Sequence, residues 1–213
     1  MAWLQKRPQV SDPVNYYSVG LNKVVLIVGL GNPGKEYELT RHNIGFLCVD
    51  EFVLKSEEMS QWIEKKDLKC LISSGQLGDS RVHIIKPSTY MNNSGQSVEL
   101  VARFYNIHPD NVIVVHDELD IDFGQIRVRK GGTSAGHNGI KSISKAIGQD
   151  YYRIRIGIGP KVPVNIDSQD FVLGRFTSKE KAQLVNLKKE VVSIISEHIF
   201  GGNLEHETRT FLV

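Results

Sequence analysis

The sequence predicts an α/β fold, in which helices cover a sheet that contains parallel strands. Apolar segments typical of strands alternate along the chain with segments of helical periodicity. The uninterrupted run 24–28 (VVLIV) is typical of a parallel strand that is buried on both faces. Polar side chains follow several of the predicted strands, as they do where α/β proteins bind ligands. The 213 residues are enough for one large domain of this class.

The first elements after strand 24–28 are a helix and a pair of strands. Apolar residues recur at helical spacing over 41–55, which predicts a helix with one buried face. Two β-forming segments, 67–77 and 81–86, are separated by a Gly-Asp-Ser turn at 78–80 and are predicted to be neighbouring strands.

The middle of the chain repeats this helix-then-strand order. An amphipathic helix is expected over 94–106, and the apolar segment 111–115 is predicted to be a strand that ends at the acidic sequence 116–120 (HDELD). This order favours parallel strands joined by helices.

The last third begins with a basic strand, 125–130, which resembles an edge strand, and a short helix over 138–148. Polar and apolar residues alternate over 153–158, as in a half-exposed strand. A long helix is expected over 178–200, because a capping box at 177–180 precedes it and two glycines follow it.

The composition is that of an ordinary globular protein, with a net charge of +2. Cys48 and Cys70 lie in apolar surroundings and are interpreted as reduced core residues, which favours a cytosol-like compartment. No segment has the length and apolarity of a membrane span. Residues 1–22 do not resemble a signal or transit peptide and are expected to form a loosely ordered extension before a domain over 23–213. A cytoplasmic location is expected, and an organelle remains an alternative.

Three predicted strands end near residues that carry chemistry, namely Asn32, Asn92 and Asp117. If these strands run parallel, the three side chains share the carboxyl edge of one sheet. His42, ten residues after Asn32, would begin a helix at the same edge. A pair of His42 and Asp117 is therefore predicted, with a neutral imidazole that accepts a proton from water and a carboxylate that fixes its tautomer. A turn-capping role for Asp117 is the alternative.

Two glycine motifs suggest other functions but lack the required context. Residues 29–34 match the dinucleotide fingerprint G-x-G-x-x-G, yet helical periodicity begins only near His42 instead of within the glycines. Residues 132–136 match the nucleophile motif G-x-S-x-G around Ser134, yet the strand before them is basic instead of buried and apolar. A loop that contacts phosphate is the preferred interpretation of the second motif. No set of histidines, cysteines or carboxylates has metal-ligand spacing, so no metal site is predicted.

Residues 125–161 are strongly basic, although the chain as a whole is nearly neutral. They contain eight lysines and arginines and a single acid, Asp150. Such a cluster suits the phosphates of a nucleic acid, although a solvated surface is the simpler alternative.

Taken together, these segments resemble the bacterial-type peptidyl-tRNA hydrolase family from Lys23 to about Phe200. The resemblance rests on these sequence blocks: 28–37 (VGLGNPGKEY) with 40–46 (TRHNIGF), 86–95 (KPSTYMNNSG), 116–120 (HDELD), and 136–139 (GHNG) with 153–159 (RIRIGIG). It implies a single α/β domain with a twisted, mixed and largely parallel sheet flanked by helices. It also implies hydrolysis of the ester between a peptide and the terminal ribose of tRNA, without a metal or organic cofactor.

The same resemblance implies roles for individual residues. His42 would be the general base that activates water, and Asp117 would orient it. Asn32, Asn92 and Asn138 would hold the peptide, the ester and the terminal nucleotide. A backbone N–H near Asn92 would stabilise the oxyanion. The remaining implied contacts are the pocket walls Tyr37 and Met91 and the tRNA-phosphate contacts Arg127, Arg129 and Arg155.

The sequence departs from the family pattern at two places, the loop residues 133–135 and Leu39, where the family commonly has glycines and a polar residue. These departures concern loop movement and substrate preference. The expected partner is the acceptor end of peptidyl-tRNA. The protein is expected to be a monomer that does not bind a membrane. Two alternatives stay open: a serine esterase that uses Ser134, and a non-catalytic RNA-binding protein on the same fold.

Overall fold

The computed structural model describes residues 23–201, 204 and 206–211. The expectation for residues 1–22 therefore lies outside the described residues. Within the described part, no helix has the length and apolarity needed to cross a membrane.

An eight-stranded sheet forms the centre of the structure, in the order β2-β3-β4-β1-β5-β7-β6-β8. The strands are β1 (Lys23–Gly29), β2 (Ile63–Lys65), β3 (Cys70–Leu77), β4 (Ser80–Pro87), β5 (Val112–Asp122), β6 (Gln125–Lys130), β7 (Tyr152–Gly159) and β8 (Thr208–Thr210). The four central strands β4, β1, β5 and β7 are parallel, and the outer strands pair antiparallel. The predicted mixed sheet is thus confirmed, and its parallel part is limited to the centre.

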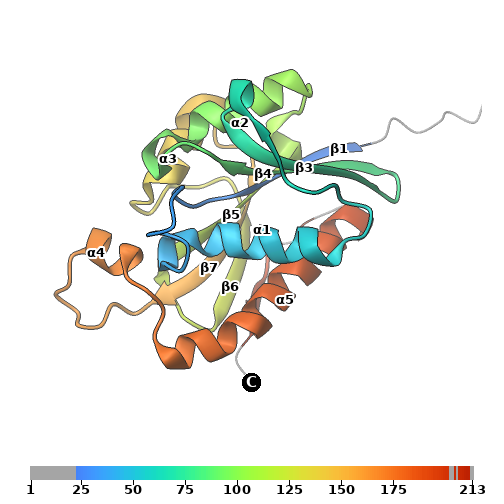
Figure 1. Cartoon of the computed structure of the whole chain (residues 1–213). Helices are drawn as coiled ribbons and strands as arrows, with labels where there is room; N and C mark the ends of the chain where they lie inside the picture. Colours follow the sequence, from blue (N-terminus) through green and yellow to red (C-terminus); the bar gives the residue numbers. More distant parts are fainter. Residues whose placement is uncertain (1–22, 202–203, 205, 212–213) are drawn as a thin grey trace, which may run out of the picture.

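Helices cover both faces of this sheet (Figure 1). The helices are α1 (Ile44–Lys55), α2 (Ser94–Phe104), α3 (Asn138–Ile147), α4 (Ser168–Leu173) and α5 (Ser178–Gly201). Helices α1 and α5 cover one face and α2 and α3 cover the other, while α4 lies beyond the sheet near the end of β7. Short 3₁₀ turns η1 (Arg41–Asn43) and η3 (Met91–Asn93) lead into α1 and α2.

Both apolar layers pack against β1, because its side chains alternate between the two faces. Val25 and Ile27 join the core with α1 and α5, and Leu26 and Val28 join the core with α2 and α3. This double burial explains the uninterrupted apolar run. Cys48 and Cys70 are free and buried, as expected, and burial raises the pKa of both thiols.

The structure corrects the predicted length of the middle strand. The acidic sequence after residue 115 was expected to end it, but β5 continues to Asp122 and pairs with β7 through a register shift. Leu119 and Ile121 alternate with exposed Asp120 and Asp122, so the apolar period of a strand persists within the acidic sequence.

The predicted exposure of the two basic strands was also wrong. β7 is not half-exposed, because it lies between β5 and β6, and Arg153 on it is only 4% exposed. β6 is not an edge strand, because β8 pairs with its outer side. The strand expected over 67–77 begins at Cys70, after a short 3₁₀ turn and a left-handed Lys69.

Candidate active site

A cavity of about 910 Å³ opens beyond the carboxyl end of β1, beside residues 117–120 of β5. It is lined by every site residue predicted from the sequence except the arginines: Asn32, Tyr37, His42, Met91, Asn92, Asp117 and Asn138. The structure therefore brings these distant polar residues to one cavity, with Asp117 within β5 instead of at its end.

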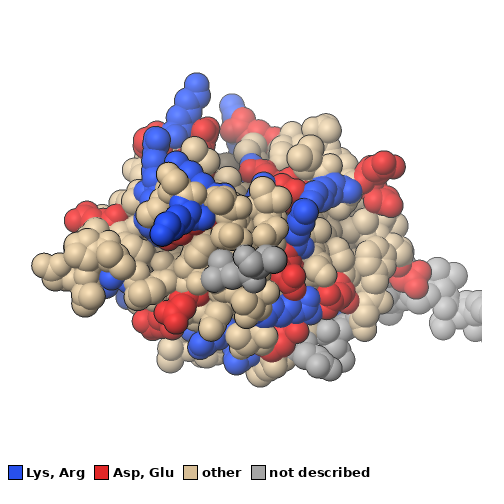
Figure 2. Space-filling view, turned by 90° about the horizontal axis from the view of Figure 1, so that it is seen from below, with Lys and Arg blue, Asp and Glu red and all other residues tan. Residues whose placement is uncertain are grey.

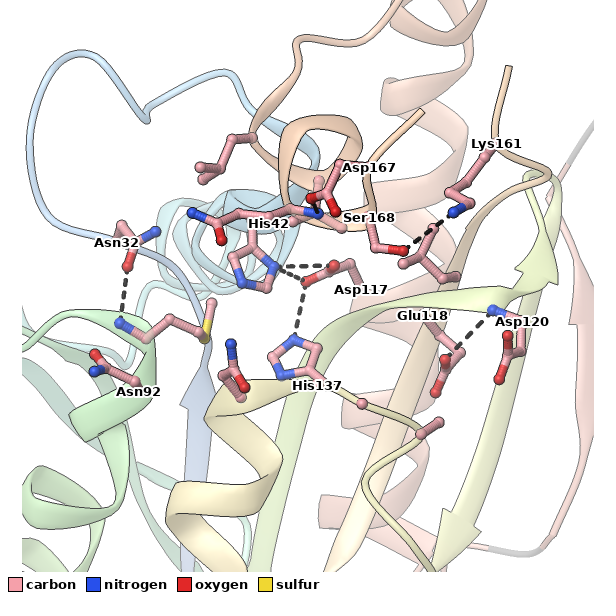
Figure 3. Close-up of a pocket in the computed structure, with 18 of the residues that line it drawn as sticks. Asn32, His42, Asn92, Asp117, Glu118, Asp120, His137, Lys161, Asp167 and Ser168 are labelled. Carbon is pink, nitrogen blue, oxygen red and sulfur yellow. Dashed lines mark hydrogen bonds and ion pairs between the residues drawn. The ribbon is translucent and has the colours of Figure 1, made fainter. Parts of the chain in front are cut away.

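His42 and Asp117 meet in this cavity although 75 residues separate them (Figure 3). His42 lies on η1, and Asp117 is near the middle of β5. The His42 Nδ1 atom is 2.9 Å from Asp117 Oδ1 and 3.0 Å from Oδ2. Because a carboxylate only accepts, Nδ1 carries the proton and Nε2 is left as an acceptor. No hydrogen bond to Nε2 is found within the described part of the chain, so this nitrogen is available to water.

Burial and charge act in opposite directions on this pair. Burial alone would lower the pKa of His42, but the Asp117 charge and hydrogen bond outweigh it and raise the pKa above 6.5. Burial would raise the pKa of Asp117, but His42 and His137 hold it far below its usual value. Asp117 is only 2% exposed and remains ionised, so it can stabilise an imidazolium on His42.

His137 is a third member of this cluster that the sequence analysis did not assign. Its Nε2 lies 3.1 Å from Asp117 Oδ1, while its Nδ1 accepts the backbone N–H groups of Gly139 and Ile140. His137 therefore carries its proton on Nε2 and donates it to Asp117. The available signal was its position just before a predicted helix, where its ring caps α3.

His116 also helps to hold Asp117 in place, through the Asp117 backbone. Its Nδ1 donates to the Asp117 backbone carbonyl at 2.6 Å, and its ring packs edge-on against His137 at 4.8 Å between centroids. Burial holds the pKa of His116 well below 6.5, so it stays neutral. The orientation of Asp117 is thus fixed through both its backbone and its side chain.

Asn32 is held rigidly at the opposite side of the cavity. Its backbone N–H donates to Asn43 Oδ1 at 2.8 Å, and Asn43 Nδ2 donates to its carbonyl at 2.9 Å. The Asn32 Oδ1 atom accepts the Met91 N–H at 2.8 Å, so its amide N–H₂ group remains to donate. The Met91 N–H next to Asn92 is consequently occupied and does not serve the predicted oxyanion contact. Asn43 is a second residue that the sequence analysis did not assign.

The remaining predicted pocket residues form the walls and the rim. Met91 is buried and lines the cavity beside Gly139 at the start of α3. Asn92 and Asn138 are exposed at the starts of η3 and α3. Tyr37 meets Tyr90 edge-on at 6.4 Å between ring centroids, and both rings line the cavity.

The outer part of the cavity was not predicted. Its lining there includes Glu118, Asp120, Lys161, Asp167 and Ser168. Lys161 Nζ donates to the Ser168 hydroxyl at 3.1 Å, which ties the segment after β7 to α4. The short helix α4 lacked a sequence signal long enough to be recognised.

The three predicted arginines lie outside the cavity and on one face of the sheet. Arg127 pairs directly with Arg155, and Arg129 pairs with Arg153. Their neighbours on β6 and β7 face the core with α1 and α5, so the arginines face the other side. Like charges that are directly opposite each other destabilise a sheet. Only Arg155 has an acidic partner among the described residues, the buried Glu118 at 3.0 Å. This arginine face suits a polyanion.

The surface on the side of α5 carries charges of both signs, unlike the arginine face (Figure 2). Figure 2 shows acidic and basic side chains interspersed there. Lys188 pairs with Glu51, and Arg209 pairs with Glu190, Glu197 and Glu207. These pairs neutralise Lys188 of α5 and place Arg209 of β8 against two glutamates of the same helix.

Two other kinds of site are the alternatives here, a serine nucleophile at Ser134 and a metal site formed by His42, Asp117 and His137. Ser134 does not line the cavity, and the nearby His137 uses both ring nitrogens in hydrogen bonds. His42, Asp117 and His137 offer ligand atoms within 4.8 Å of one another, the one such group in the described residues. His42 Nδ1 and His137 Nε2 both donate hydrogen bonds to Asp117. This is the arrangement of an oriented base.

Comparisons with known proteins agree with each other. The chain matches the family described as peptidyl-tRNA hydrolase over residues 26–211. It is 44% identical over 183 residues to a peptidyl-tRNA hydrolase of Wolbachia sp. subsp. Brugia malayi, covering 84% of this chain and 95% of the relative. It is 47% identical over 178 residues to one of Ehrlichia ruminantium, covering 82% and 85%. A crystal structure of peptidyl-tRNA hydrolase from Acinetobacter baumannii superposes with a TM-score of 0.76 at 36% identity, covering 85% and 91%.

Proposed function

Since the chain belongs to the peptidyl-tRNA hydrolase family, we propose that it hydrolyses the ester between a peptide and the terminal ribose of tRNA, with His42 as the general base. The observation that carries this proposal is the His42–Asp117 contact, in which Nδ1 is bonded to the carboxylate and Nε2 is left to accept a proton. A water molecule on Nε2 loses its proton to the imidazole as its oxygen attacks the ester carbonyl.

The charges that develop in this reaction have partners in the cavity. The imidazolium formed on His42 is stabilised by Asp117, which is already ionised and held by His137 and His116. The Asn32 amide N–H₂ group donates to the carbonyl oxygen as it becomes negative, with the side chain of Asn92 nearby. When the tetrahedral intermediate collapses, the proton on His42 passes to the ribose oxygen and the peptide leaves as a free acid.

The substrate binds across the sheet edge in this proposal. Tyr37, Met91, Asn92 and Asn138 hold the reacting end of peptidyl-tRNA in the cavity. The arginine face receives tRNA phosphates, and Arg155 connects it to the cavity through Glu118. A monomeric state, a cytoplasmic location and the absence of a cofactor stay predictions.

The test of the proposed function compares two substrates on the same tRNA. An N-blocked aminoacyl-tRNA mimics the end of a peptide, whereas an unblocked aminoacyl-tRNA carries a free ammonium group. We expect release of tRNA from the blocked substrate and much slower release from the unblocked one, measured by loss of the acid-precipitable amino acid. Tight RNA binding without any release would instead favour the non-catalytic RNA-binding alternative.

The arginine face makes a prediction about salt. Substituting Arg127→Ala or Arg129→Ala should weaken tRNA binding and reduce the slope of log affinity against log salt by about one unit each. The reason is that each lost phosphate contact no longer releases a counterion. Titrations of tRNA at several salt concentrations measure the slope. Lys189→Ala on the exposed side of α5 is the matched control and should leave the slope unchanged. Slopes equal to that of the parent protein in both arginine variants would remove the arginine face from tRNA binding.

A further inference from the structure

A second cavity of about 530 Å³ adjoins the first, and Asn32 lines both. Its walls combine apolar and polar residues and come from the loop after β1, from α1 and from β3 and β4. The apolar residues are Pro33, Leu39, Phe46, Leu47, Leu71 and Pro87. Apart from Asn32, no residue that lines this cavity takes part in the proposed mechanism or in the arginine face.

The two cavities are bordered by the same two segments of the chain. On the loop after β1, Tyr37 lines the first cavity and Leu39, two positions later, lines the second. On the segment after β4, Tyr90 lines the first cavity and Ser88, two positions earlier, lines the second. Asn32 therefore marks the border between the cavities, where its side chain joins the loop after β1 to the segment after β4 by accepting the Met91 N–H. A chain whose carbonyl group reacts beside Asn32 is placed at this border.

The charges in the second cavity balance. Lys86 is paired with Asp50, and its ammonium group also lies 4.5 Å from the ring centre of Trp62. Lys35 and Glu38 on the loop carry the other two charges. A cavity with two positive and two negative groups does not select phosphate, and its apolar residues suit an uncharged chain.

The order of the strands separates the two parts of the substrate. The second cavity reaches β3 and β4 through Leu71, Lys86 and Pro87. The reacting groups follow β1 and lie on β5, and the arginine face lies on β7 and β6. These three places follow one another along the sheet (Figure 1). If the tRNA lies toward β6, the peptide leaves the reacting ester toward β4.

We propose that the second cavity binds the peptide residues that precede the ester-linked residue, an inference that rests on the proposed function. An extended chain advances about 3.3–3.6 Å per residue, so residues upstream of the ester-linked one pass Asn32 and enter the second cavity. Leu39 is an apolar side chain that is 47% exposed at this place, and contact with the peptide accounts for its exposure.

The test measures how the cost of a substitution depends on peptide length. The variant Leu39→Ser is assayed with an N-acetylated aminoacyl-tRNA and with a pentapeptidyl-tRNA of apolar residues, both ending in the same amino acid on the same tRNA. We expect KM for the long substrate to rise about tenfold relative to KM for the short one, because apolar contact area is lost. The kcat for the long substrate should not change, because the lost contact is equal in the ground and transition states.

Leu54→Ser is the matched control, because Leu54 is 82% exposed on α1 and lines neither cavity. The KM ratio of the control should equal that of the parent protein. Equal effects of Leu39→Ser on both substrates, or no effect on either, would overturn the inference while leaving the proposed function intact. Failure of the parent protein to hydrolyse either substrate would instead overturn the proposed function.

Discussion

Replacing His42 by alanine should abolish hydrolysis of peptidyl-tRNA and leave tRNA binding nearly unchanged. Loss of a positioned general base costs about 10²–10⁴-fold in rate. The binding expectation follows from the geometry, since the arginine face lies on β6 and β7 and not in the cavity. Single-turnover hydrolysis and tRNA titration measure the two effects separately.

The control for this variant is Ser134→Ala, which should keep parental activity because Ser134 lies outside the cavity. The serine-esterase alternative predicts the opposite result, with loss of activity on substitution of Ser134 and an acyl adduct on its hydroxyl. Full activity of His42→Ala would remove the imidazole from the mechanism.

Replacing Asp117 by asparagine should be nearly as damaging, although the side chain keeps its size. An asparagine amide can donate to His42 Nδ1, which places the imidazole proton on Nε2, where the water must be activated. In a Ser-His-Asp triad this error of tautomer costs about 10⁴-fold in kcat, and we expect a loss on this scale. The KM for peptidyl-tRNA should change little.

A matched control for this variant is Asp120→Asn, on the same strand. Asp120 lines the outer cavity, is exposed and has no contact with His42. Its hydrolysis rate should stay within a few fold of the parent rate. Thermal unfolding of both variants separates a catalytic defect from a folding defect. An Asp117→Asn variant that is folded and retains the parent rate would show that the carboxylate does not orient the base.

The sequence predicted the central strands and the shared site well, because these features have strong local signals. The run 24–28 is apolar on both faces, and the polar residues after β1 and β4 follow directly from their strands. The segments that were missed are β2, β8 and α4, of three, three and six residues. Elements this short exist through tertiary contacts and have no periodicity that can be recognised.

The roles of His137, His116 and Asn43 could not be inferred from the chain alone. Each acts through a contact that only the folded structure brings together, as when His137 reaches Asp117 from the start of α3. The extension of β5 through the acidic sequence had a signal, the alternation of Leu119 and Ile121, which the high charge obscured. The burial of β7 depends on β6, which pairs with its outer side, and this strand order is a property of the whole sheet.

The most direct test of a His42 base oriented by Asp117 is a pH titration of the His42 ring by nitrogen NMR, compared with the pH dependence of kcat/KM. The neutral ring is the base, so the rate should fall as pH decreases through the pKa of His42 and reach a plateau above it. We expect a neutral form protonated at Nδ1, an NMR pKa above 6.5 that matches the kinetic pKa, and a lower pKa in Asp117→Asn, where burial acts without the carboxylate. A neutral ring protonated at Nε2, or a kinetic pKa that does not coincide with that of His42, would contradict the account.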